Sequence, residues 1–149
     1  MAGQLTRKIL FYHRDDTFPR VFDKLLNHYC ELACEILWVS EPKELIEVAI
    51  RERPHIIFVY LFPFLAFETH RLIDVTIPLR RHIALKNIPT VAFSNYTNDI
   101  LPTVIEHGFQ GHFRPGGRFQ EFAECIDTVL GGGSYFSAEN SFRSPLRPA

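Results

Sequence analysis

Pro54-His55-Ile56-Ile57-Phe58-Val59-Tyr60-Leu61 is the stretch that decides the fold of this chain. From Ile56 it is an unbroken run of apolar, mostly β-branched or aromatic residues, which is typical of a strand buried on both faces. Such strands lie in the middle of a parallel sheet covered by helices, and ligands bind there just outside the carboxyl ends of the strands. We therefore expect Tyr60, at the end of this strand, to lie at the functional edge of the sheet.

The composition limits the classes of function. The 149 residues, 46% hydrophobic and 22% charged, are typical of one globular domain with its own core. A formal net charge of -1 gives no electrostatic argument for binding nucleic acid or an anionic membrane surface. No stretch approaches the roughly 20 apolar residues of a membrane span, and no signal region is evident at the start. We expect a cytoplasmic protein. The 14 phenylalanines indicate an aromatic core or an exposed apolar patch for a partner.

Strand and helix signals alternate along the chain. Five strands are predicted, at residues 8–13, 35–39, 54–61, 88–94 and 109–114. Five helical segments alternate with them, at residues 17–29, 40–53, 64–87, 98–107 and 118–130. This alternation implies a parallel sheet with right-handed crossovers.

The second helical segment carries the clearest local signals. Ser40 is its expected N-cap, and Pro42 falls in its first turn. Its predicted inner face consists of Leu45, Ile46, Ala49 and Ile50.

Three other positions interrupt or end elements. Pro78 breaks the third helical segment into two pieces or kinks it. Gly108 is the expected C′ residue of the fourth. The polar tail from Ser134 is expected to be only partly ordered.

The last third of the chain resembles the end of a bacterial response-regulator receiver domain. The resemblance rests on Gly108-Phe109-Gln110-Gly111-His112-Phe113-Arg114 and on the stretch from Phe122 to Ser137. The closing Gly-Gly-Gly-Ser-Tyr-Phe-Ser is most similar to regulators of the LuxR/NarL type. Earlier in the chain, Arg53-Pro54-His55-Ile56-Ile57 resembles the entry to the third receiver strand, and residues 88–94 resemble the fourth strand.

This resemblance covers residues 7–137 and implies a CheY/flavodoxin-like fold. That fold is α/β, a three-layer doubly wound (βα)5 sandwich whose parallel five-stranded sheet has the strand order 2-1-3-4-5. Residues 1–137 are then a receiver-like domain, and residues 138–149 a C-terminal tail or the start of a linker.

The residues at the reaction site depart from the family pattern. The phosphoacceptor aspartate of the third strand is replaced by Tyr60. The acidic pair after the first strand, which holds Mg²⁺ through carboxylate oxygens, is replaced by His13 and Arg14, with Asp15 and Asp16 following late. Tyr60 either fills a redundant pocket or fixes the domain in one conformational state. The pattern is that of an atypical or pseudo-receiver without metal or cofactor.

The switch positions of the family are changed as well. Ser94 keeps the hydroxyl at the end of the fourth strand, and it is alternatively a helix cap. Arg114 or Pro115 stands where the family has a lysine, and His112 holds the place of the switch aromatic. His112 is either a pH-sensitive group or an ordinary half-buried strand histidine.

Three functions are compatible with this pattern, and we expect no enzymatic activity. The first is phosphorylation-independent signalling by contact with a protein partner or with itself as a homodimer. Its expected interface is Tyr96, Leu101, Ile105, Phe119 and Phe122. The second is the regulatory domain of a LuxR/NarL-type transcription factor, whose DNA-binding domain is absent from this chain. The third is a small-molecule or anion sensor that uses the altered cleft.

Overall fold

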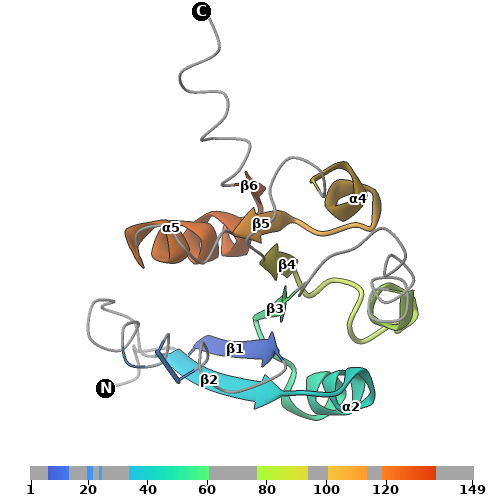
Figure 1. The fold of residues 1–149 in the computed structure, drawn as a ribbon. Coiled ribbons are helices and arrows are strands. Elements are labelled where there is room, and N and C mark those ends of the chain that lie inside the picture. The colour runs from blue at the N-terminus through green and yellow to red at the C-terminus, as the bar shows by residue number, and fades with distance from the viewer. Residues whose placement is uncertain are drawn as a thin grey trace, which may run out of the picture.

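The structure is a computed structural model that describes residues 7–13, 20, 21, 24, 34–60, 77–93, 101–113 and 119–136. Its described strands form one sheet, and every neighbouring pair in it is parallel (Figure 1). The strand order is β2-β1-β3-β4-β5-β6. The strands are β1 (Arg7–Tyr12), β2 (Cys34–Val39), β3 (Ile56–Tyr60), β4 (Thr90–Phe93), β5 (Gly111–Phe113) and β6 (Tyr135–Phe136).

The predicted architecture is confirmed for its five strands, in the order 2-1-3-4-5. The fourth and fifth strands are shorter than predicted, since Ile88 and Pro89 precede β4 and Phe109 and Gln110 precede β5. The sixth strand was not predicted. Tyr135–Phe136, which pair with β5, are an ordered part of the tail that we expected to be only partly ordered from Ser134.

Three helices have described bounds: α2 (Pro42–Glu52), α4 (Leu101–Glu106) and α5 (Phe119–Leu130). Residues 77–81 and residues 20, 21 and 24 are also helical. Residues 82–87 form a bend and a turn, so the third predicted helix ends at Arg81 and its predicted extension to Asn87 is wrong. Residues 64–76 and most of the first predicted helix lie outside the described residues, so the effect of Pro78 stays a prediction. Gly108 follows α4 with a φ of 87°, in the left-handed conformation expected of a C′ glycine.

Two details of α2 correct the sequence analysis. Its N-cap is Glu41, not Ser40, and the Ser40 backbone N–H instead donates to the Glu44 carboxylate (3.4 Å). Pro42 occupies the start of the helix as expected. Ile50 is exposed, because Leu45 and Ala49 alone fill the deepest positions of the inner face.

Helices on the two faces of the sheet enclose two separate cores. In Figure 1, α5 covers one face, and α2 and α4 cover the other. On the α5 side lies the aromatic core, which consists of Ile9, Phe11, Ile56, Phe58, Val91, Phe93, Phe113, Phe122, Cys125, Ile126 and Val129. On the α2 and α4 side lies the aliphatic core, which consists of Leu10, Val39, Leu45, Ala49, Ile57, Val59, Leu79, Leu85, Ala92, Val104 and Phe109. Neighbouring strand residues alternate between the two cores, as pleating requires.

No helix in the described part of the chain is long and apolar enough to span a membrane.

Candidate functional site

Two side chains from central strands meet at the carboxyl edge of the sheet. Tyr60 is the last residue of β3, and His13 directly follows β1. The register pairs Tyr12 with Val59, so the next residues of the two strands, His13 and Tyr60, come to lie side by side. Both side chains point to the face of the aromatic core, because they alternate with Tyr12 and Val59.

The imidazole of His13 stacks on the phenol ring of Tyr60. The ring centroids are 4.1 Å apart and the planes are inclined by 24°. Phe93, which is paired with Tyr60 on the neighbouring strand, contacts both rings. Its ring centroid lies 5.0 Å from that of Tyr60 and 5.8 Å from that of His13. His13 is only 4% exposed and Tyr60 is half-buried. We call His13, Tyr60 and Phe93 the edge cluster.

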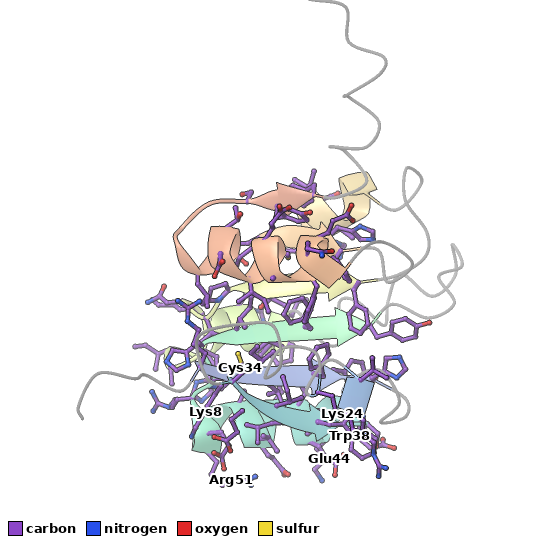
Figure 2. All side chains as sticks on the ribbon, turned by 90° about the vertical axis from the view of Figure 1, so that its left-hand side faces the viewer. Lys8, Lys24, Cys34, Trp38, Glu44 and Arg51 are labelled. Carbon is purple, nitrogen blue, oxygen red and sulfur yellow. The ribbon has the colours of Figure 1, made fainter. Side chains whose placement is uncertain are left out.

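The backbone of His13 is held from β2. Its N–H donates to the Val39 carbonyl (3.0 Å), and its carbonyl accepts from the Trp38 indole Nε1–H (3.0 Å). Figure 2 shows Trp38 at the opposite end of the sheet from Lys8 and Arg51, which mark the amino edge. Trp38 is 41% exposed, so this aromatic ring covers the end of β1 while one side stays accessible to solvent.

The edge cluster continues without a break into the aromatic core. Phe11 contacts Phe93 edge-on at 5.7 Å and stacks on Phe58 at 5.1 Å. Phe122, on α5, lies 5.1 Å from Phe58. Aromatic pairs at such separations add roughly 0.5–1.5 kcal/mol each beyond their burial. The position of Tyr60 is thus coupled by ring contacts to the helix that covers this face.

Chemically, the edge cluster offers an imidazole, a phenol and a phenyl ring. Mg²⁺ prefers carboxylate and carbonyl oxygens, and the described residues hold no group of three His, Cys, Asp or Glu side chains suited to a metal ion. A phenol is not the carboxylate nucleophile that forms an aspartyl phosphate. Asp15 and Asp16, the nearest carboxylates in the sequence, lie outside the described residues.

Of the predicted site residues, the structure brings His13 and Tyr60 together. His112 is fully buried in β5, paired with Ala92 of the aliphatic core, and so lies on the other face of the sheet from Tyr60. It is not the half-buried histidine that we expected. The remaining site positions lie outside the described residues: Arg14, Asp15, Asp16, Ser94, Arg114 and Pro115.

The predicted interface changes in composition. Phe122 is fully buried in the aromatic core, so its assignment to a surface is wrong. It faces the sheet because it shares one side of α5 with Cys125, Ile126 and Val129. Ile105 on α4 is 48% exposed and remains available. Tyr96 and the side chains of Leu101 and Phe119 lie outside the described residues.

Phe93 and Trp38 are not among the predicted site residues. A signal for both existed in strand alternation: Phe93 is paired with Tyr60 and Trp38 with Phe11, so each belongs to the aromatic face. The sequence alone does not set this register, which depends on how the strands are aligned.

A small hollow lies at the other edge of the sheet. It is lined by Leu79, Arg80, Thr90, His107, Gly108 and Phe109. Thr90 begins β4, so the hollow is at the amino ends of the strands. The Arg80 guanidinium already donates to the His107 carbonyl (2.9 Å). This hollow does not include His13 or Tyr60, so it is not the altered cleft of the sensor alternative.

The described ion pairs lie away from the edge cluster. Lys8 Nζ is 3.0 Å from Glu52 Oε1, and Arg51 Nε is 3.2 Å from Glu52 Oε2. The hydrogen bond from Lys8, followed by that from Arg51, lowers the pKa of Glu52 from its ordinary value. Burial in the aromatic core raises the pKa of the Cys125 thiol, which keeps it protonated and unreactive.

Solved structures of response-regulator receiver domains have the same fold as this chain. A LuxR-family two-component response regulator from Aurantimonas sp. SI85-9A1 has a TM-score of 0.72 at 13% identity, covering 93% of this chain and 94% of that one. The isolated REC domain of RcsB from Salmonella enterica serovar Typhimurium, solved with the phosphomimetic BeF3-, has a TM-score of 0.71 at 11% identity. The match covers 92% of this chain and 98% of that domain. A response regulator from Desulfuromonas acetoxidans has a TM-score of 0.68 at 16% identity, covering 84% of this chain and 97% of that one.

No protein-family model matches the sequence, and no curated protein matches it either. The likeness to solved structures therefore establishes the receiver fold alone.

Proposed function

We propose that this protein is an atypical receiver domain that transmits a signal by protein contact, without accepting a phosphoryl group. The observation that carries the proposal is the stack of His13 on Tyr60, 4.1 Å apart, at the carboxyl ends of β1 and β3. This is the edge at which folds of this type carry their chemistry.

The chemistry of the two rings supports the proposal. Phosphorylation of a receiver needs a carboxylate nucleophile on the third strand and carboxylates that hold Mg²⁺ after the first. Here the third strand ends in a phenol, Tyr60, and not in a carboxylate. The residue after β1 is an imidazole stacked on that phenol, so neither of these two positions offers a carboxylate.

The packing also supports a fixed conformational state. Tyr60 contacts His13 and Phe93, and Phe93 contacts the buried Phe11 and Phe58. Moving Tyr60 between two positions disturbs several ring contacts at once, which opposes a switch at this residue. The module then acts as a constitutive docking domain, with residues 1–137 as its extent, no catalysis and no cofactor.

A more specific role follows from one of the structural relatives. The likeness to the LuxR-family regulator from Aurantimonas favours a regulatory domain of a transcription factor as the second candidate. In that case the contact surface would act on a DNA-binding domain.

Treatment with acetyl phosphate and Mg²⁺, followed by intact-protein mass spectrometry, tests the proposal. We expect no phosphoryl adduct, and a thermal midpoint that Mg²⁺ and the phosphomimetic beryllofluoride leave unchanged. A receiver domain with its phosphoacceptor aspartate serves as the positive control under the same conditions. A hydroxylamine-sensitive adduct that disappears in a variant with Asp15→Asn and Asp16→Asn would overturn the proposal.

A further inference from the structure

The sixth strand approaches β5 so closely at Gly111 that a side chain there would clash with it. A Cβ atom on Gly111 would lie 2.5 Å from the backbone carbonyl oxygen of Tyr135, closer than side chains and backbone approach one another. Gly111 is not among the residues with positive φ, so its backbone conformation does not require glycine. The close approach of β6 therefore accounts for the glycine in β5.

Polar contacts fix the start of β6 on β5. The Tyr135 N–H donates to the Gln110 carbonyl (3.1 Å). Gln110 is in turn held by Thr90: its N–H donates to the Thr90 carbonyl (2.8 Å), and its side-chain oxygen accepts from the Thr90 N–H (2.8 Å). The acceptor that receives β6 is thus positioned by β4, independently of β6 itself. We call Gln110, Gly111 and His112 the β5 seat.

The two residues of β6 close both cores at once. Tyr135 packs against the aromatic core and Phe136 against the aliphatic core, and each stays half-buried. The seat consequently takes an extended segment with two adjacent large aromatic residues.

The attachment of β6 is weak in comparison with that of the other strands. The described strand has two residues, and the connection to α5, Gly131-Gly132-Gly133-Ser134, is exposed throughout. A Cβ on Gly132 would meet nothing within 4 Å. Short edge elements with few buried contacts open well before the global unfolding of a domain.

From these observations we infer that the β5 seat is a strand-exchange site, and that its partner is a second copy of this chain. The copy inserts its own Tyr135–Phe136 in place of the resident β6. A second copy is the partner that the structure supports, because the seat already holds this segment in the matching register. The inference rests on the proposed function, since it names the partner for signalling by contact.

Two complementary variants of the full chain test the inference. The strand donor carries Gly111→Ala, which blocks its own seat and leaves β6 released. The seat donor carries Tyr135→Ser and Phe136→Ser, which leaves the seat open. We expect each variant alone to be monomeric, and the unlabelled strand donor to shift the amide signals of Gln110, Gly111 and His112 in the isotope-labelled seat donor, saturably and with 1:1 stoichiometry.

Matched controls separate strand exchange from other contacts. Adding Gly111→Ala to the labelled seat donor should weaken association by at least about tenfold. Adding Ile105→Ala, on the exposed face of α4, should leave it unchanged. Backbone amide spectra verify that each variant keeps the sheet.

Absence of association between the complementary variants would overturn the inference, and so would association that depends on Ile105 and not on Gly111. Neither result bears on the phosphoryl adduct measurement, so strand exchange and the proposed function fail separately.

Discussion

The two cores of this protein are built from different side chains. Five phenylalanines are buried in the aromatic core: Phe11, Phe58, Phe93, Phe113 and Phe122. The described aliphatic core contains a single one, Phe109, among leucine, isoleucine, valine and alanine. The difference matters because rings have preferred orientations, whereas branched aliphatic side chains mainly fill volume. Ring contacts in the aromatic core therefore constrain the orientation of the Tyr60 ring, while the aliphatic core packs α2 and α4 against the sheet.

The largest expected effect on stability comes from removing one central side chain from each core. Phe58→Ala and Ile57→Ala change neighbouring residues that are both fully buried, on opposite faces of the sheet. We expect the free energy of unfolding to fall by about 3–5 kcal/mol for Phe58→Ala and about 2–5 kcal/mol for Ile57→Ala. Denaturant titration measures both values.

The two variants should differ at the edge cluster. Phe58→Ala should alter the near-ultraviolet circular dichroism and the ring signals of Tyr60, because Phe58 contacts Phe11 and Phe93. Ile57→Ala should leave them close to those of the wild type. Phe58→Leu and Ile57→Val give the same comparison if an alanine variant is too unstable. Equal spectral changes in both members of a pair would refute the division into two cores.

A double-mutant cycle sharpens the comparison at the edge itself. His13→Ala, Tyr60→Leu and the combined variant isolate the energy of the stacked pair. We expect a coupling of about 0.5–1.5 kcal/mol, the range for aromatic pairs in contact. A matched cycle with His13→Ala and Val59→Ala should give near-zero coupling, since Val59 faces the aliphatic core. A coupling of zero for His13 and Tyr60 would show that their stack carries no energy.

Trp38 provides a smaller test and a probe. Trp38→Phe keeps a ring on the aromatic face but removes the Nε1–H that donates to the His13 carbonyl. We expect the free energy of unfolding to fall by about 0.5–1.5 kcal/mol, the worth of one hydrogen bond. As the single tryptophan of the chain, Trp38 also reports on this edge by its fluorescence. Its native emission should change in His13→Ala and stay constant in Ile57→Ala.

The smallest expected effect is on the pH dependence of stability, through Glu52 on the side of the sheet with the aliphatic core. Glu52 ends α2, and the hydrogen bond from Lys8 lowers its pKa. A depressed carboxylate pKa stabilises the folded state above the unfolded pKa, and this contribution is lost as the pH falls through the folded pKa. Lys8→Met should thus lower stability at pH 7 by more than it does below about pH 4, near the ordinary glutamate value.

Urea titrations at the two pH values measure this difference. The emission of Trp38 in the native state should be the same for Lys8→Met and wild type, because Lys8 lies at the opposite edge of the sheet (Figure 2). An equal loss of stability at both pH values would exclude a role for the Glu52 charge.

Local sequence signals sufficed where an element has a strong pattern of its own. The apolar run of β3 predicted a central buried strand, and β3 indeed lies between β1 and β4. Gly108 predicted the end of α4, since its left-handed backbone is easily adopted only by glycine. Alternation of strands and helices predicted the parallel sheet.

Features that depend on long-range alignment were not predictable in this way. Tyr135 and Phe136 follow Gly131-Gly132-Gly133-Ser134 and form too short a run to indicate a strand, and only the neighbouring β5 makes them one. His13 and Tyr60 are 47 positions apart in the sequence. The register of β1 against β3 brings their rings into contact, and the sequence alone does not set that register. Phe122 and Ile105 both follow helical patterns, and only packing on the sheet tells buried from exposed.

The direction of β6 decides at which edge of the sheet Phe136 lies. Because β6 runs parallel to β5, it begins at the edge where α5 ends and finishes at the edge occupied by His13 and Tyr60. A domain fused directly after Phe136 would therefore leave the sheet at the edge where β1 and β3 also end, with β4 and β5 between β6 and β3. An affinity tag meant to leave that edge open belongs before Arg7, on the far side of the sheet.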